Sequence, residues 1–187
     1  MTTCGIVLAA GAGTRFGGPK GLARAGDGTP WVATVVRTLR DAGCDPVIVV
    51  VGAAADAVAA LVPAGAVVAP AEDWSDGLSA SVRAGLSAAA ETPAEAALIV
   101  PVDVPDLTAS ACRRVMAGAG RASLRRARYE GAPGHPVLIG RDHWYRVAAE
   151  LTGDRGAGAY LRDHVADAVE CADLWHGQDV DHRAAPA

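Results

Sequence analysis

Residues 8–20 read LAAGAGTRFGGPK and follow a short apolar run, residues 5–10, that is typical of a β-strand. Glycines at 11, 13, 17 and 18 allow sharp turns and let backbone N–H groups approach a ligand, because no Cβ is in the way. Successive free N–H groups form a concave anion site, to which Arg15 and Lys20 add positive charge. The stretch therefore predicts a phosphate site at the carboxyl end of a parallel sheet.

Neither of two common phosphate-binding motifs fits this loop. A Walker A motif counted from Gly13 reaches Gly18, but Pro19 stands where the motif requires lysine. The dinucleotide fingerprint counted from Gly11 requires a glycine at position 16, where Phe16 stands. The loop is therefore either an anion site of another kind or a glycine-rich turn with surface charges.

Composition limits the class of protein and its partners. The 187 residues suit one domain, residues 1–187, and with half of them hydrophobic they can bury a sizeable core. The net charge of −4 argues against nucleic acid or an anionic membrane as a partner. The chain shows no membrane-spanning run, no signal peptide and no paired cysteines, which favours a cytoplasmic protein with reduced thiols.

Apolar runs alternate with helical patterns along the chain. Buried parallel strands are predicted, after the first one, at residues 46–51, 66–69 and 97–102. Helices are predicted at residues 31–42, 53–61, 77–90, 108–117, 141–151 and 158–164. Residues 123–139 interrupt the alternation with two strands around a glycine turn, and a short strand follows near Val169. The order predicts a single-domain, three-layer α/β sandwich, Rossmann-like, with a mostly parallel sheet and an antiparallel excursion.

The glycine loop also matches a family signature, L-A-[AG]-G-x-x-x-R-[MF]-G-x-x-K. The matching residues are Leu8, Ala9, Ala10, Gly11, Arg15, Phe16, Gly17 and Lys20. The chain thereby resembles the molybdenum cofactor cytidylyltransferases, within the MobA-like nucleoside-triphosphate transferase superfamily. The resemblance implies that the nucleotide is bound by Leu8, Ala9, Ala10, Gly11 and Gly13. It also implies two catalytic cations, with Arg15 on the β- and γ-phosphates and Lys20 at the α-phosphate.

Two aspartates are candidates for binding Mg²⁺, which prefers one or two carboxylates together with phosphate oxygens and water. Asp103 follows the buried run 97–102, and residues 102–105 resemble the family's D-x-P metal motif. A turn-forming aspartate is the alternative. Residues 179–181 begin a second family pattern, D-[IV]-D-T-P-E-D, which this chain leaves at His182. Asp181 is therefore either a second metal ligand or part of a polar tail.

Two further segments resemble motifs of the same family. Residues 76–86, DGLSASVRAGL, resemble a segment that contacts the nucleoside, with Ser81 as the best match; read plainly, they form a serine-capped helix. Residues 134–138, GHPVL, resemble a segment at the acceptor side. The proline after His135 holds that residue extended, so its ring either projects into the cleft or forms part of a turn.

The resemblance implies transfer of CMP from CTP to the phosphate of molybdopterin, with Mg²⁺ and release of pyrophosphate. Ala10 favours CTP, because guanylyl enzymes of the family have glycine there, but one methyl group discriminates by only about 1–3 kcal/mol and leaves GTP open. A molybdenum hydroxylase is the implied recipient of the product. Two alternatives stay open: transfer to another phosphorylated small molecule, and a non-catalytic or redox relative of the fold.

Overall fold

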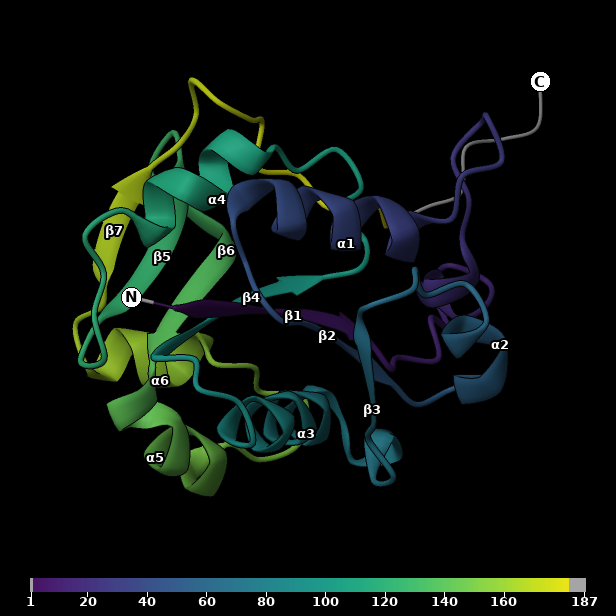
Figure 1. The fold of residues 1–187 in the computed structure, drawn as a ribbon, viewed down its shortest axis with the longest axis horizontal. Coiled ribbons are helices and arrows are strands. Elements are labelled where there is room, and N and C mark those ends of the chain that lie inside the picture. Colours follow the sequence, from purple (N-terminus) through teal and green to yellow (C-terminus); the bar gives the residue numbers. More distant parts are fainter. Residues whose placement is uncertain (1, 182–187) are drawn as a thin grey trace.

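A seven-stranded sheet with the order β3-β2-β1-β4-β6-β5-β7 forms the middle layer of the protein in the computed structural model, which describes residues 2–181 (Figure 1). The strands are β1 (Thr3–Ala9), β2 (Val47–Val51), β3 (Val67–Pro70), β4 (Ala96–Pro101), β5 (Leu124–Tyr129), β6 (Ala132–Gly140) and β7 (Asp167–Glu170). Within the described residues only β6 runs against the others, pairing antiparallel with both β4 and β5. The carboxyl ends of the parallel strands therefore lie along one edge of the sheet, and those of β1 and β4 are next to each other.

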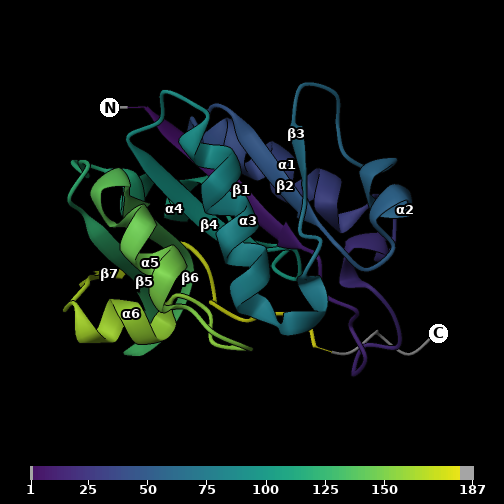
Figure 2. The same cartoon turned by 90° about the horizontal axis from the view of Figure 1, so that it is seen from below.

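Helices cover both faces of the sheet (Figures 1 and 2). They are α1 (Trp31–Ala42), α2 (Ala55–Ala59), α3 (Leu78–Ala90), α4 (Ala109–Met116), α5 (Trp144–Glu150) and α6 (Gly158–Asp163). Three short 3₁₀ turns, η1 (Lys20–Leu22), η2 (Trp74–Asp76) and η3 (Arg141–His143), join these elements. The α1 and α4 helices pack on one face, whereas α3, α5 and α6 pack on the other. None of the helices between residues 2 and 181 has the length and apolar character needed to cross a bilayer.

The strand residues alternate between two hydrophobic cores. Val7 and Val49 belong to the core beneath α1, whereas Ile6 and Ile48 belong to the core beneath α3, and all four are fully buried. Alternation arises because successive side chains of a strand point to opposite faces. With both faces covered, the central strands β1, β2 and β4 read as continuous apolar runs, which is why the sequence pattern located them.

The predicted fold class is confirmed, with corrections to several element boundaries. The helix predicted over residues 53–61 spans only Ala55–Ala59, and Val58 is its one buried residue. The helix predicted over residues 141–151 begins as η3, because the Arg141 guanidinium donates to the carbonyls of Thr92 and Ala94 at 2.7 and 2.8 Å and ties that turn to the connection between α3 and β4. The β4 strand ends at Pro101, so Asp103 lies in the turn that follows it.

Candidate functional site

The glycine loop leaves β1 at the carboxyl edge of the sheet and borders a cavity of about 520 Å³. The loop is closed by N–H donors of Phe16 and Gly18, which bond the Gly13 carbonyl at 2.9 and 3.0 Å. Gly13 has φ +60°, and a Cβ there would collide with the Gly18 carbonyl. Glycine is thus required at this position by both conformation and space.

All of the predicted site residues except His135 line this cavity, which we call the loop cavity. They are Leu8, Ala9, Ala10, Gly11, Gly13, Arg15, Lys20, Ser81, Asp103 and Asp181. Residues separated by more than 170 positions are therefore brought to one edge of the sheet. This is the place where ligands bind in open parallel α/β sheets.

Lys20 connects the two predicted metal ligands. Its Nζ donates to Asp103 Oδ2 at 2.8 Å and to Asp181 Oδ1 at 3.0 Å. The side chains of Lys20 and Asp103 are 16% and 17% exposed, whereas that of Asp181 is 55% exposed. Burial alone would lower the pKa of Lys20, but its hydrogen bonds to the two carboxylates outweigh that effect and leave the pKa raised. Lys20 is therefore a full cation at neutral pH.

The carboxylates around Lys20 fit a divalent cation. Oxygens of Asp103, Asp179 and Asp181 all lie within 4.8 Å of one another. Asp103 Oδ1 is buried and has no hydrogen-bond partner among the described residues. A buried carboxylate oxygen without a donor is costly unless a cation or water completes its coordination. Oxygen ligands of this number and charge match the preference of Mg²⁺ or a similar hard cation.

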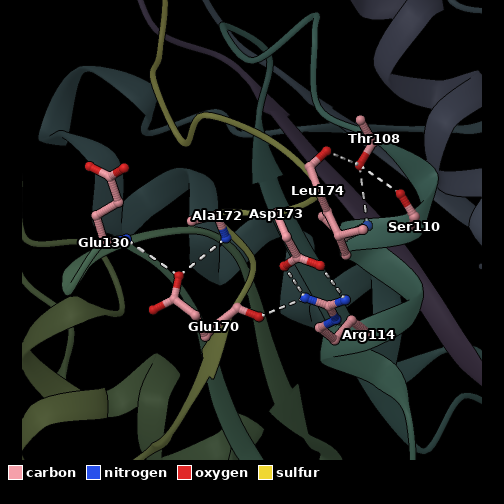
Figure 3. Close-up of polar contacts among 9 residues, drawn as sticks. Thr108, Ser110, Arg114, Glu130, Glu170, Ala172, Asp173 and Leu174 are labelled. Atoms are coloured by element: carbon pink, nitrogen blue, oxygen red, sulfur yellow. Dashed lines mark hydrogen bonds and ion pairs between the residues drawn. The ribbon is translucent and has the colours of Figure 1, made fainter.

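The segment that leads to Asp179 and Asp181 is anchored at residues 170–174 by Arg114 on α4 and by Thr108 at its N-cap (Figure 3). Arg114 donates through both terminal nitrogens to the Asp173 carboxylate, one of them at 2.9 Å, and also to the Glu170 carbonyl at 3.0 Å. Thr108 donates to the Leu174 carbonyl at 3.2 Å. Further along, Val180 N–H donates to the Asp103 carbonyl at 2.9 Å. These contacts bring the last acidic residues back to the edge of β4.

Ser81, which the sequence singles out for contact with the nucleoside, lies in α3, is buried and lines the loop cavity. Trp74 lines the same cavity, although no sequence motif had singled it out. The available signal was Gly52, because a Cβ there would come within 2.6 Å of Trp74 Cβ and 2.8 Å of the Ala10 carbonyl. A glycine after the buried strand β2 thus indicates that another part of the chain packs closely against the backbone there. The sequence alone does not show that this part is Trp74.

His135 lies in a second cavity of about 620 Å³, which shares Leu8 and Leu78 with the loop cavity. We call it the arginine cavity, because Arg126, Arg155 and Arg162 line it. The residue His135 is half-buried, but its Nδ1 atom is fully buried and lacks a hydrogen-bond partner among the described residues. Burial lowers the pKa of His135 to about 4, and the charge of Arg126 acts in the same direction. His135 is therefore neutral at pH 7.

The three arginines were not predicted as site residues. Residues 123–139 read as a hairpin in the sequence, and no feature of that stretch favours one of its arginines over another. The structure distinguishes them, because Arg125 donates to the Val115 carbonyl of α4, whereas Arg126 lines the arginine cavity. Adjacent strand residues point to opposite faces, so only one of the two reaches the site.

Comparison with known proteins identifies the family. The model of the MobA-like NTP transferase domain matches residues 5–169. The chain is 36% identical over 190 residues to nicotine blue oxidoreductase of Paenarthrobacter nicotinovorans, a match that covers 95% of this chain and 91% of that protein.

Solved structures agree with this assignment. Rv0371c of Mycobacterium tuberculosis superimposes with a TM-score of 0.81 at 29% identity, over 97% of this chain and 93% of that one. A complex of Rv0371c with manganese gives a TM-score of 0.73 at 27% identity, over 91% of this chain and 87% of that one. With the matched domain spanning most of the described sheet, the chain belongs to the MobA-like NTP transferase family and is a nucleotidyltransferase of that family.

Proposed function

We propose that the protein transfers CMP from CTP to the phosphate of molybdopterin and releases pyrophosphate. The observation that carries this proposal is the cluster of Lys20 with Asp103 and Asp181 beside the glycine loop. Transfer of a nucleotidyl group between two anionic substrates depends on positioning and charge neutralisation more than on a protein nucleophile. The loop cavity offers both backbone N–H groups and cations for this purpose.

Each residue of the loop cavity takes a role that its chemistry allows. Arg15 and the N–H groups of the loop hold the β- and γ-phosphates. Lys20 uses two of its three N–H donors on Asp103 and Asp181 and directs the third toward the α-phosphate. Asp103, Asp179 and Asp181 would hold Mg²⁺, which, when bound, screens the charge of the triphosphate.

The base and the acceptor occupy the two neighbouring cavities at the carboxyl edge of the sheet, the base in the loop cavity and the acceptor in the arginine cavity. Ala10 is buried and lines the loop cavity, and its methyl group narrows the space there in favour of cytosine over guanine. Ser81 contacts the nucleoside. The acceptor reaches the α-phosphate from the side of His135, in the arginine cavity next to Leu8 and Leu78. A molybdenum hydroxylase receives the product.

A redox reaction is the second candidate. It is favoured by the 36% identity, over nearly the whole chain, to a protein named nicotine blue oxidoreductase. The same fold would then bind a nucleotide as a carrier of reducing equivalents rather than as a donor of a nucleotidyl group. The two candidates differ in what is released and are therefore separable in one set of assays.

The test incubates the protein with Mg²⁺, molybdopterin and each nucleoside triphosphate in turn, and measures pyrophosphate. We expect release with CTP, weaker release with GTP, and a loss of at least a hundredfold in Asp103→Asn. Asp106→Asn is the matched control, because Asp106 is an exposed carboxylate on the same turn and does not line the loop cavity. No release with any triphosphate would reject the proposal. Bleaching of nicotine blue with a reduced nicotinamide cofactor, without pyrophosphate release, would support the redox candidate instead.

A further inference from the structure

The arginine cavity is lined mainly by positive charges, although the protein as a whole is negatively charged. The whole chain carries a net charge of −4, yet Arg126, Arg155 and Arg162 line this one cavity together with a single carboxylate, Asp163. None of the three arginines has an ion-pair partner within 4.0 Å among residues 2–181. Positive groups held together without counter-charge are stabilised by binding an anion.

The guanidinium groups are placed by the fold. Arg126 is half-buried on β5, and its Nε donates to the Gly134 carbonyl at 3.2 Å, which fixes the plane of the group. A Cβ at Gly158 would lie 3.4 Å from Arg126 Nη1 and 3.8 Å from Arg162 Nη1, so both groups border the same point. Burial and the charge of Arg162 lower the pKa of Arg126, as expected for two cations that face each other.

The remaining walls of the cavity are different in character. Its aliphatic lining consists of Leu8, Leu78, Val82, Ile99 and Val137. His135 lines the cavity as a neutral ring, and its buried Nδ1 has no hydrogen-bond partner among residues 2–181. A volume of about 620 Å³ lies within the range of small-molecule sites. The cavity thus combines an apolar surface, a single neutral hydrogen-bonding group and a cationic rim.

We propose that the arginine cavity binds the non-reacting end of the acceptor, and that this end is an apolar body carrying a negative charge held by Arg126 and Arg162. The proposal rests on the proposed function in one respect, because it places the reacting phosphate of the acceptor in the loop cavity. The dithiolate of molybdopterin supplies negative charge of this kind, whereas the pterin end of that molecule is neutral. A second phosphate or a carboxylate on another acceptor has the same chemistry.

The proposal is tested first without turnover, by binding of inorganic phosphate or acetate measured as a shift in melting temperature at constant ionic strength. The half-saturating phosphate concentration should rise at least fivefold in Arg162→Glu and in Arg126→Gln. Arg162 is exposed on α6, so its variant keeps the proposal testable even if Arg126→Gln impairs folding. Arg37→Gln, on an exposed face of α1 across the sheet, should bind phosphate as the wild type does. Tighter binding of acetate than of phosphate would indicate a carboxylate on the acceptor.

The proposal is overturned if phosphate and acetate bind equally well to the wild type and to both cavity variants. It is also overturned if the response is lost only in Arg15→Gln, since the anion would then occupy the loop cavity. With an active acceptor, Arg162→Glu should raise the KM for that acceptor about tenfold and change the KM for the nucleotide less than twofold. Because the phosphate assay needs neither nucleotide nor turnover, failure of the pyrophosphate assay would not affect it.

Discussion

Replacing Lys20 by methionine should lower the free energy of unfolding by about 2 kcal/mol, most of it from the contact with Asp103. A hydrogen bond between charged groups contributes about 1.5–3 kcal/mol, and the Lys20–Asp103 pair is only 16% and 17% exposed. The contact with Asp181 is as short, at 3.0 Å, but that side chain is 55% exposed. Solvent screening therefore limits its contribution to about 0.5 kcal/mol or less. Burial, rather than distance, is expected to rank the two contacts.

Two double-mutant cycles measure this ranking by urea unfolding at pH 7 in metal-free buffer. One combines Lys20→Met with Asp103→Asn, and the other combines Lys20→Met with Asp181→Asn. We expect coupling energies of about 1.5 kcal/mol and below about 0.5 kcal/mol, respectively. The raised pKa of Lys20 means that its contribution is complete below its ordinary pKa of 10.5 and is lost only as the pH rises through the folded-state value.

A coupling energy for Asp181 equal to or larger than that for Asp103 would refute the reasoning, because exposure would then not decide the strength of the contacts. Coupling near zero for both pairs would show that Lys20 contacts neither carboxylate in solution. The second result would also remove the cluster on which the proposed function depends.

Two further perturbations test other parts of the site. As the pH falls from 6.5 toward 4, His135 becomes protonated in the unfolded chain but stays neutral in the folded protein. The free energy of unfolding should therefore fall by up to about 3 kcal/mol across that pH window. His135→Asn should flatten this part of the pH profile, measured by urea unfolding. A profile that is the same in both proteins would contradict the burial of Nδ1. Gly77→Ala should destabilise the fold by about 2 kcal/mol and raise the KM for the nucleotide, because Gly77 has φ +101° and a Cβ there would come within 2.6 Å of the Gly153 carbonyl carbon. Gly26→Ala is its control in thermal unfolding, since a Cβ at Gly26 meets nothing within 4 Å; equal effects of both substitutions would contradict the steric argument.

The sequence predicted β1, β2 and β4 well because these strands are buried on both faces and read as unbroken apolar runs. It singled out the loop residues that line the loop cavity, because these residues are adjacent in the chain and constrained by glycine, as at Gly13. The arginine cavity was not predicted, because Arg126, Arg155 and Arg162 come from a strand, a loop and a short helix that only the fold brings together. The boundary at Arg141 failed for a similar reason, since its partners at Thr92 and Ala94 are more than 45 positions away.

Arg114 and Thr108 act on the chemistry of the loop cavity without lining it. They fix Asp173 and Leu174, and only seven positions separate Leu174 from Asp181, so the tether is short and has no regular secondary structure. The local concentration of the Asp179 and Asp181 carboxylates at Asp103 is then set by this tether and by the Val180 N–H bond to the Asp103 carbonyl, rather than by a rigid strand. Affinity for a divalent cation should accordingly depend on contacts that lie on α4, away from the cation itself. In related chains, changes in this anchor offer a way to tune metal affinity while every metal ligand stays the same.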